Sequence, residues 1–211
     1  RILDQFGETP ERLRDVSVSL EKLGDLALKV DGDAVSARQH FEETLALARR
    51  ILEQFGETPE RLRDVSVSLN KLGNLALEVD GDAATARQHF EEALALRRRI
   101  LDQFGETPER LRDVSVSLNN LGNLALEVDG DAVTAGQQFE EALALRQRTL
   151  EQFGETPERL RDVSVSLYKL ADLAQKVEAD AAMAIQHFED ALKIQRRYLK
   201  LSPAATTAVT D

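Results

Sequence analysis

Apolar residues recur at three- and four-residue steps along two segments that a short polar stretch separates. In residues 59–79 the apolar positions are Leu62, Val65, Leu69, Leu72, Leu75, Ala76 and Val79. In residues 83–104 they are Ala86, Phe90, Ala93, Leu96, Ile100 and Phe104, widened by Leu94 and Leu101. Such steps place each set on one face of a helix. The pattern predicts two amphipathic helices, called the A helix and the B helix below.

The residues between the helices carry start and stop signals. Thr58 is suited to cap the A helix and Pro59 to occupy its first turn. Gly81 can adopt the left-handed conformation that ends a helix, and Asp82 can cap the B helix, which Gly105 ends. Two helices joined by so short a loop lie antiparallel, so the unit is a helical hairpin.

This unit is repeated along the chain. Copies of 49 residues occupy 1–49, 50–98, 99–147 and 148–196, and the run QFGETPERLRDVSVSL is identical at 5–20, 54–69, 103–118 and 152–167. A fixed period of this size is typical of a solenoid. The repeats predict an all-α solenoid, or superhelix, spanning residues 1–201. Its hairpins are expected at about 9–55, 58–104, 107–153 and 156–201, with a mobile tail at 202–211. Residues 1–7 match the end of a B helix, so we expect that they are the remnant of a longer array.

Small and aromatic residues within the hairpins resemble the tetratricopeptide repeat (TPR) pattern. The second copy has Leu72, Gly73 and Ala76 in the A helix, followed by Ala86, Phe90 and Ala93 in the B helix. The matching residues of the other copies are Leu23, Gly24, Ala37 and Phe41; Leu121, Gly122, Ala135, Phe139 and Ala142; and Leu170, Ala184, Phe188 and Ala191. The long helices resemble the subtype found in kinesin light chains and their bacterial relatives. The resemblance implies a bacterial binding scaffold.

The sequence departs from the TPR pattern in several columns. Leu69 stands where the family has Trp, Ala76 where it has Tyr, and Ala171 replaces the Gly in the last copy. The repeat is also longer than the family's usual length of about 34 residues.

Composition excludes several classes of function. The 211 residues carry a net charge of −11, with both signs interspersed, so nucleic acid is not the expected partner. No apolar run is long enough to cross a membrane. The chain has no Cys, which excludes thiolate chemistry and favours a cytoplasmic location.

Columns that change only in the last copy suggest the end of the array. Leu28, Leu77 and Leu126 correspond to Gln175, and Ala46, Ala95 and Ala144 correspond to Lys193. A capping repeat needs polar residues on its outer side. We therefore expect an authentic C-terminal cap.

Three further variable columns lie on one face of the A helices, at spacing i, i+1 and i+4. They are Glu21, Asn70, Asn119 and Tyr168; Lys22, Lys71, Asn120 and Lys169; and Asp25, Asn74, Asn123 and Asp172. The TPR resemblance implies that this face lines a concave groove. Asn side chains both donate and accept hydrogen bonds, which suits capture of an extended peptide. The alternative is drift at exposed positions that packing does not constrain.

No cofactor or metal site and no catalytic constellation is expected. His40, His89 and His187 share one column with Gln138, and each His precedes a carboxylate by three residues, which is too few ligands for a metal. Asp-Gly-Asp at 80–82 lacks the later ligands of a calcium loop. We therefore predict that the chain is not an enzyme.

Three hypotheses of function follow. The first is a scaffold that binds a protein or peptide, as the adaptor or sensor segment of a larger protein. The second is a structural spacer or a self-assembling array, in which copies associate through the N-terminal end. The third is the regulatory region of a signalling enzyme whose catalytic part lies elsewhere.

Overall fold

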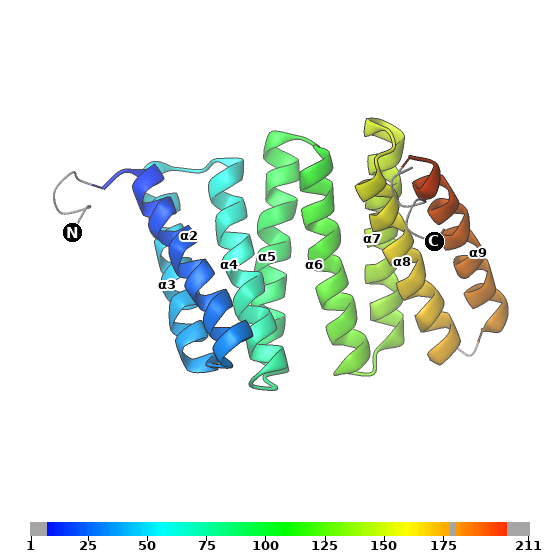
Figure 1. Ribbon diagram of the computed structural model, residues 1–211, viewed down its shortest axis with the longest axis horizontal. Coiled ribbons are helices and arrows are strands. Elements are labelled where there is room, and N and C mark those ends of the chain that lie inside the picture. The colour runs from blue at the N-terminus through cyan, green and yellow to red at the C-terminus, as the bar shows by residue number, and fades with distance from the viewer. Residues whose placement is uncertain (1–7, 178–179, 202–211) are drawn as a thin grey trace, which may run out of the picture. The chain divides into compact units, whose positions relative to one another are not determined.

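The computed structural model describes residues 8–177 and 180–201, and they form helices joined by short turns, without a strand (Figure 1). The predicted remnant at 1–7 and the predicted tail at 202–211 lie outside the described residues. The predicted fold class, an all-α solenoid of antiparallel hairpins, is confirmed.

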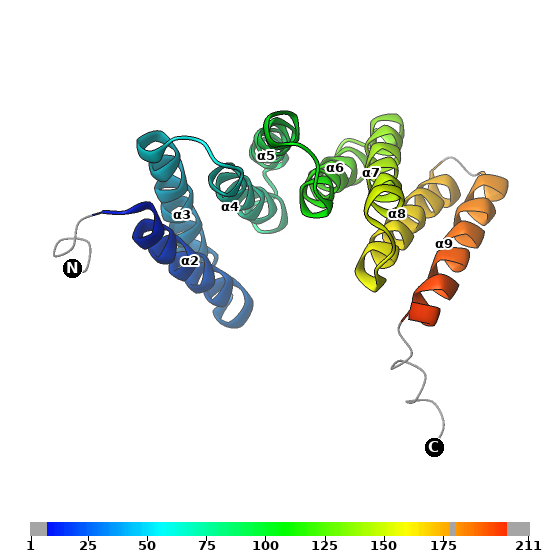
Figure 2. The ribbon, with the colours of Figure 1, turned by 90° about the horizontal axis from the view of Figure 1, so that it is seen from above.

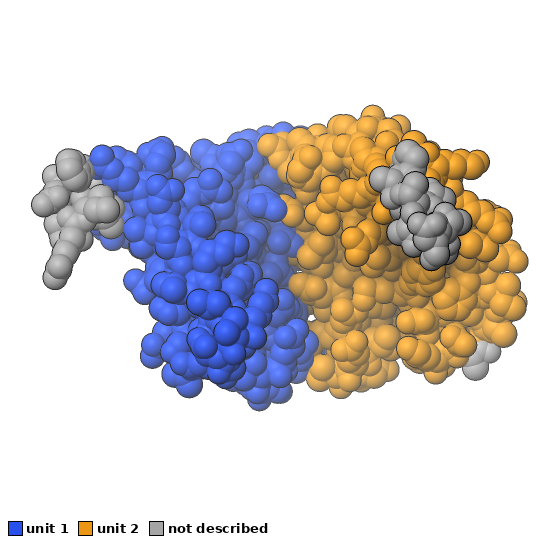
Figure 3. Space-filling model, in the orientation of Figure 1, with its two compact units in different colours: residues 1–105 blue, residues 106–211 orange. Residues whose placement is uncertain are grey.

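The chain divides into two compact units, residues 1–105 and residues 106–211 (Figure 3). Unit 1 contains α2 (Pro10–Leu26), the π-helical turn η1 (Ala27–Asp31), α3 (Ala34–Phe55), α4 (Pro59–Glu78) and α5 (Ala83–Phe104). Unit 2 contains α6 (Pro108–Glu127), α7 (Ala132–Phe153), α8 (Pro157–Lys176) and α9 (Ala181–Leu201). Even-numbered helices are the A helices and odd-numbered helices are the B helices.

Within each unit every helix packs against the helix that follows it. In unit 1, α2 and α4 lie in one layer and α3 and α5 in the other (Figure 2). This alternation buries a B helix between the A helix of its own repeat and the A helix of the next one.

The predicted start and stop signals operate as expected. Thr58 accepts a hydrogen bond from the backbone N–H of Arg61 at 3.2 Å, and Pro59 opens α4. Gly81 has φ of 67° and Gly105 has φ of 76°, the region that side chains disfavour. Asp82 accepts a bond from the N–H of Thr85 at 3.0 Å and caps α5. The helix boundaries therefore follow from local chemistry that each repeat carries.

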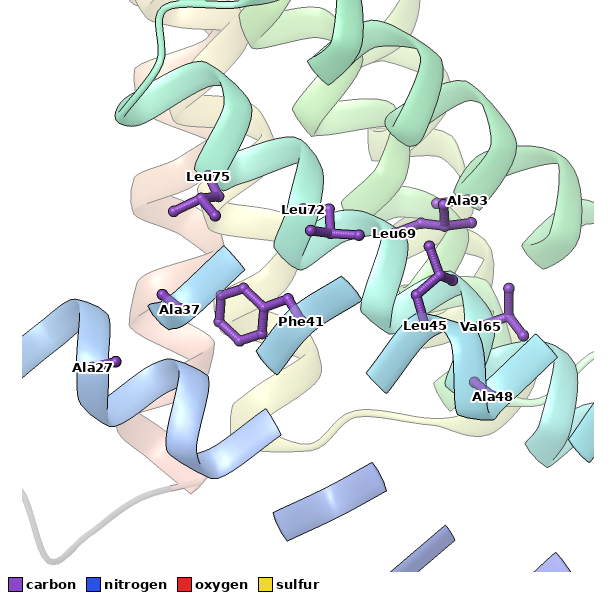
Figure 4. Packing of buried hydrophobic residues seen from close by; sticks show 10 residues of the cluster. All are labelled: Ala27, Ala37, Phe41, Leu45, Ala48, Val65, Leu69, Leu72, Leu75 and Ala93. Carbon is purple, nitrogen blue, oxygen red and sulfur yellow. The ribbon is translucent and has the colours of Figure 1, made fainter. Parts of the chain in front are cut away.

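The core of unit 1 joins two repeats in one apolar cluster (Figure 4). Phe41 and Leu45 of α3 lie beside Leu69 and Leu72 of α4. The remaining buried members are Ala27, Ala37, Ala48, Val65, Leu75 and Ala93. This cluster is the interface between successive repeats, and it makes the two hairpins one packed body.

Two expectations about burial are wrong. Phe104 and Val79, at the ends of their predicted apolar stripes, are exposed because each helix ends there. Ala46, Ala95 and Ala144 are also exposed, so Lys193 replaces a residue that the solvent already reaches. Lys193 is therefore no sign of a capping repeat.

Candidate protein-binding site

The twelve predicted site residues all lie on the A helices α2, α4, α6 and α8, and the structure divides them by burial. Four are exposed: Lys22, Asn74, Tyr168 and Asp172. Six are half-buried: Glu21, Asp25, Lys71, Asn120, Asn123 and Lys169. We call these ten residues the A-helix face.

The other two, Asn70 and Asn119, lie in the interior, with exposed fractions of 8% and 7%. The Nδ2 atom of Asn70 donates to the backbone oxygen of Ser66 at 2.9 Å, one helical turn earlier. The expected row of Asn side chains facing a ligand is therefore wrong for this column. In the two inner repeats, the side chains of this column are buried among the neighbouring helices.

Tyr168 occupies the same column in the last repeat and is partly exposed. Its ring centroid lies 5.9 Å from that of Phe188, and its hydroxyl accepts a hydrogen bond from Nε2 of Gln195 at 2.9 Å. Both partners belong to α9, so the B helix of the repeat fixes the orientation of this ring.

In unit 1 a lysine joins two repeats through carboxylates. Nζ of Lys71 donates to Oδ1 of Asp25 at 2.5 Å and lies 3.7 Å from a carboxylate oxygen of Glu21. The ammonium group also stands 5.7 Å from the ring centroid of Phe41, a cation–π distance. The charge of Lys71 is therefore neutralised within the unit.

The equivalent lysine of unit 2 has a different partner. Nζ of Lys169 donates to the amide oxygen of Asn123 at 2.7 Å and lies 5.2 Å from the ring centroid of Phe139. Burial lowers the pKa of Lys169, an effect that Arg146 adds to and that Glu127 and Asp172 oppose. The hydrogen bond to Asn123 satisfies one donor, and within the described part of the chain the ammonium group has no direct contact with a carboxylate.

Two residues of the third column, Asn74 and Asp172, are exposed. Asn74 presents its amide to solvent in unit 1. Asp172 in unit 2 lies 3.6 Å from Lys176, one turn later on the same helix, in an exposed ion pair. Such pairs contribute little to stability, so these side chains are available for other contacts.

Sequence reasoning missed the buried arginine of the B helices. Nε of Arg146 donates to Oγ of Ser115, and its Nη1 donates to Oγ of Ser166 and to the backbone oxygen of Asp162. Arg97 is equally buried, and its Nε donates to Oγ of Ser66 at 3.2 Å. A signal was present, because Arg97 falls between Ala93 and Ile100 on the apolar stripe of its helix.

His89 and Asp82, two of the side chains considered as metal ligands, have their pKa values set by burial and by neighbouring side chains. Burial lowers the pKa of His89, with Glu92 and Glu42 opposing the shift and Arg49 adding to it. In residues 8–177 and 180–201 no group of three or more His, Asp or Glu side chains could hold a metal ion. Hydrogen bonds from Thr85 lower the pKa of Asp82, as a helix cap requires.

One stretch of the chain matches a family of known proteins. The model of the tetratricopeptide repeat family matches residues 65–104, most of one hairpin whose sequence recurs in the other copies. This match, on one of four near-identical copies, supports the assignment of the repeats as TPR repeats. TPR repeats generally mediate protein–protein interaction or scaffolding. None of the helices that the structure describes is both long and apolar enough to span a bilayer.

A solved structure supports the helical-repeat fold. The crystal structure of BtubC (BKLC) from P. vanneervenii superposes with a TM-score of 0.51, over 97% of this chain and 94% of that one, at 18% sequence identity. Identity at this level shows a shared fold only. A comparison with curated protein sequences found no match.

Proposed function

We propose that the A-helix face binds an extended segment of another protein, and that Lys169 receives an acidic group of that segment. The proposal extends the general role of TPR repeats to named residues of unit 2. Its ligand is identified by chemistry alone, as a peptide that carries a carboxylate.

The contrast between Lys71 and Lys169 carries the proposal. The two lysines occupy one column and each lies over a buried Phe ring, yet Lys71 contacts carboxylates whereas Lys169 contacts the neutral amide of Asn123. A half-buried ammonium group gains more from an ionised partner than from a neutral amide, because the Coulomb attraction between two opposite charges is stronger in low-dielectric surroundings. A carboxylate from a ligand would give Lys169 the partner that Asp25 gives Lys71.

Neighbouring groups suit the rest of such a ligand. The Nδ2 group of Asn123, whose amide oxygen accepts from Lys169, can donate to an extended backbone. Tyr168 adds an aromatic surface whose orientation Phe188 and Gln195 already fix, so little conformational entropy is lost on binding. The face therefore combines one charge with a set of ordered polar and aromatic contacts.

Selection from a library of random peptides tests the proposal. The wild-type protein is expected to enrich peptides rich in Asp and Glu, and Lys169→Met is expected to lose this enrichment. Lys176→Met is the matched control, because it removes the same charge from an exposed position of the same helix. Enrichment that survives Lys169→Met and disappears with Lys176→Met would assign recognition to a diffuse surface charge and contradict the proposal.

The finer predictions from sequence belong to the same proposal. A role as adaptor or sensor segment, a cytoplasmic location and a bacterial origin stay predictions. So does the alternative that the array regulates an enzyme. The drift hypothesis, in contrast, predicts that no substitution on the A-helix face changes peptide selection.

A further inference from the structure

The first described hairpin exposes apolar residues whose counterparts in the next repeat are buried. Leu23 is 48% exposed and Leu26 is 53% exposed, whereas the equivalent Leu72 and Leu75 are 5% and 1% exposed. Val16 follows the same pattern relative to Val65. In unit 1 those counterparts on α4 pack against α3 of the preceding repeat. The outer side of α2, here called the leading face, therefore carries the residue types of an internal repeat interface and leaves them exposed.

The last hairpin exposes the opposite half of the same interface. Leu192 of α9 is 45% exposed, whereas its equivalent Leu45 in α3 is 8% exposed and belongs to the inter-repeat cluster. Phe188, the equivalent of buried Phe41, is half-buried. We call this side of α8 and α9 the trailing face. It presents the residue types that α3 presents to α4.

Charged residues on the two faces are complementary in the same register. Within unit 1, Arg14 pairs with Asp64 at 2.6 Å and Arg49 pairs with Glu92 at 2.6 Å, each across one repeat boundary. Lys71 pairs with Asp25 in the reverse direction. Moving the partner on the later repeat back by one 49-residue period, and the partner on the earlier repeat forward by three periods, gives the corresponding residues of the two faces. These residues are all exposed: Arg161 with Asp15, Arg196 with Glu43, and Lys22 with Asp172.

We propose that the trailing face of one molecule binds the leading face of a second copy of this chain, head to tail, in the geometry of an internal repeat boundary. Leu192 would pack against Leu23 and Leu26, and the three charge pairs would fix the register. The interface is heterologous, so each molecule keeps one free face and the assembly can grow. Gln175, a polar residue where inner repeats have Leu, weakens the contact without removing its apolar centre.

The test uses two variants that each block one face. Leu23→Asp places a carboxylate on the leading face and Leu192→Asp places one on the trailing face, both at exposed positions where the fold tolerates a charge. Circular dichroism confirms that helicity is unchanged. Each variant alone is expected to associate about a hundredfold more weakly than the wild type in sedimentation velocity, because an unpaired carboxylate would be buried.

Mixing the two variants separates head-to-tail assembly from other modes. Leu23→Asp retains its trailing face and Leu192→Asp retains its leading face, so the equimolar mixture is expected to form a 1:1 dimer and no larger species. A wild-type protein that stays monomeric at every concentration would overturn the proposal. So would a mixture that stays monomeric, or a Leu192→Asp protein that still self-associates.

Charge reversal tests the register independently. Lys22→Glu and Asp172→Lys are each expected to weaken association of the wild-type protein about fivefold, the effect of one exposed ion pair, and the double variant is expected to restore it. Failure of the double variant to recover would exclude this register. Neither outcome depends on peptide binding by Lys169, so the two proposals succeed or fail separately.

Discussion

A Cβ atom on Gly73 would stand 2.5 Å from Cε1 of Phe90, well inside van der Waals contact. The A helix and the B helix of this hairpin thus approach so closely that only glycine fits opposite the ring. Gly24 with Phe41 and Gly122 with Phe139 repeat the relationship. In the last repeat, Ala171 replaces the glycine and Phe188 is half-buried.

We predict that Gly73→Ala lowers the free energy of unfolding by about 1–3 kcal/mol, because Phe90 is enclosed and cannot move away. Urea denaturation followed by circular dichroism measures the change. Gly136→Ala is the matched control, since its Cβ would meet only the flexible end of Leu173 at 3.3 Å. That variant is expected to be neutral or to gain up to about 1 kcal/mol from helix propensity. Equal effects of the two substitutions would refute the steric explanation.

Arg146 links two repeats of unit 2 through hydrogen bonds to α6 and α8. Arg146→Met keeps most of the volume but leaves three acceptors without their donor, on Ser115, Asp162 and Ser166. We expect a loss of about 1.5–3 kcal/mol in unfolding free energy, the range for hydrogen bonds to a charged group. An unchanged or higher stability would mean that the cost of burying the guanidinium exceeds the contribution of its hydrogen bonds.

His89 gives the protein a defined response to acid. Burial lowers the pKa of His89 in the folded state below its unfolded value of about 6.5, so the unfolded state binds the proton more readily. Stability from this residue is therefore present above the unfolded pKa and is lost as the pH falls through the folded pKa. His89→Gln, the residue type found at Gln138, should lose less stability between neutral and mildly acidic pH than the wild type. Parallel stability curves for the two proteins would contradict this assignment.

Thr58 caps α4 through a single hydrogen bond to the N–H of Arg61. Thr58→Ala removes the acceptor and is expected to cost about 1 kcal/mol, whereas Thr58→Ser keeps the hydroxyl and should cost less than half of that. Thermal denaturation of the two variants measures the difference. If both variants lose the same stability, the methyl group of Thr58 and not its hydroxyl is responsible.

The fold was accessible from sequence because its determinants are local. Thr58, Pro59, Gly81 and Asp82 specify where helices begin and end, and the spacing of apolar residues specifies which sides pack. Antiparallel pairing then follows from short loops. The TPR pattern around Gly73 adds the close helix contact that the structure contains.

The site was less accessible because burial at the edge of a helix face depends on neighbouring helices. Asn70 and Lys71 are adjacent in sequence, yet one is enclosed and the other reaches a carboxylate of the preceding repeat. Arg97 reads as a surface residue by type but occupies a core position. The spacing of residues along one helix predicts which way a side chain points. The position of the neighbouring helix then decides whether that side chain is buried.

The central claim is that Lys169 recognises a ligand because Asn123, unlike Asp25, gives its ammonium group a neutral hydrogen-bond partner. Isothermal titration calorimetry of Asn123→Asp with a peptide selected by the wild-type protein tests this most directly. The variant supplies an internal carboxylate, so we predict that affinity for the acidic peptide falls about ten- to hundredfold while helicity is unchanged. An Asn123→Asp protein that binds the peptide as tightly as the wild type would contradict the claim.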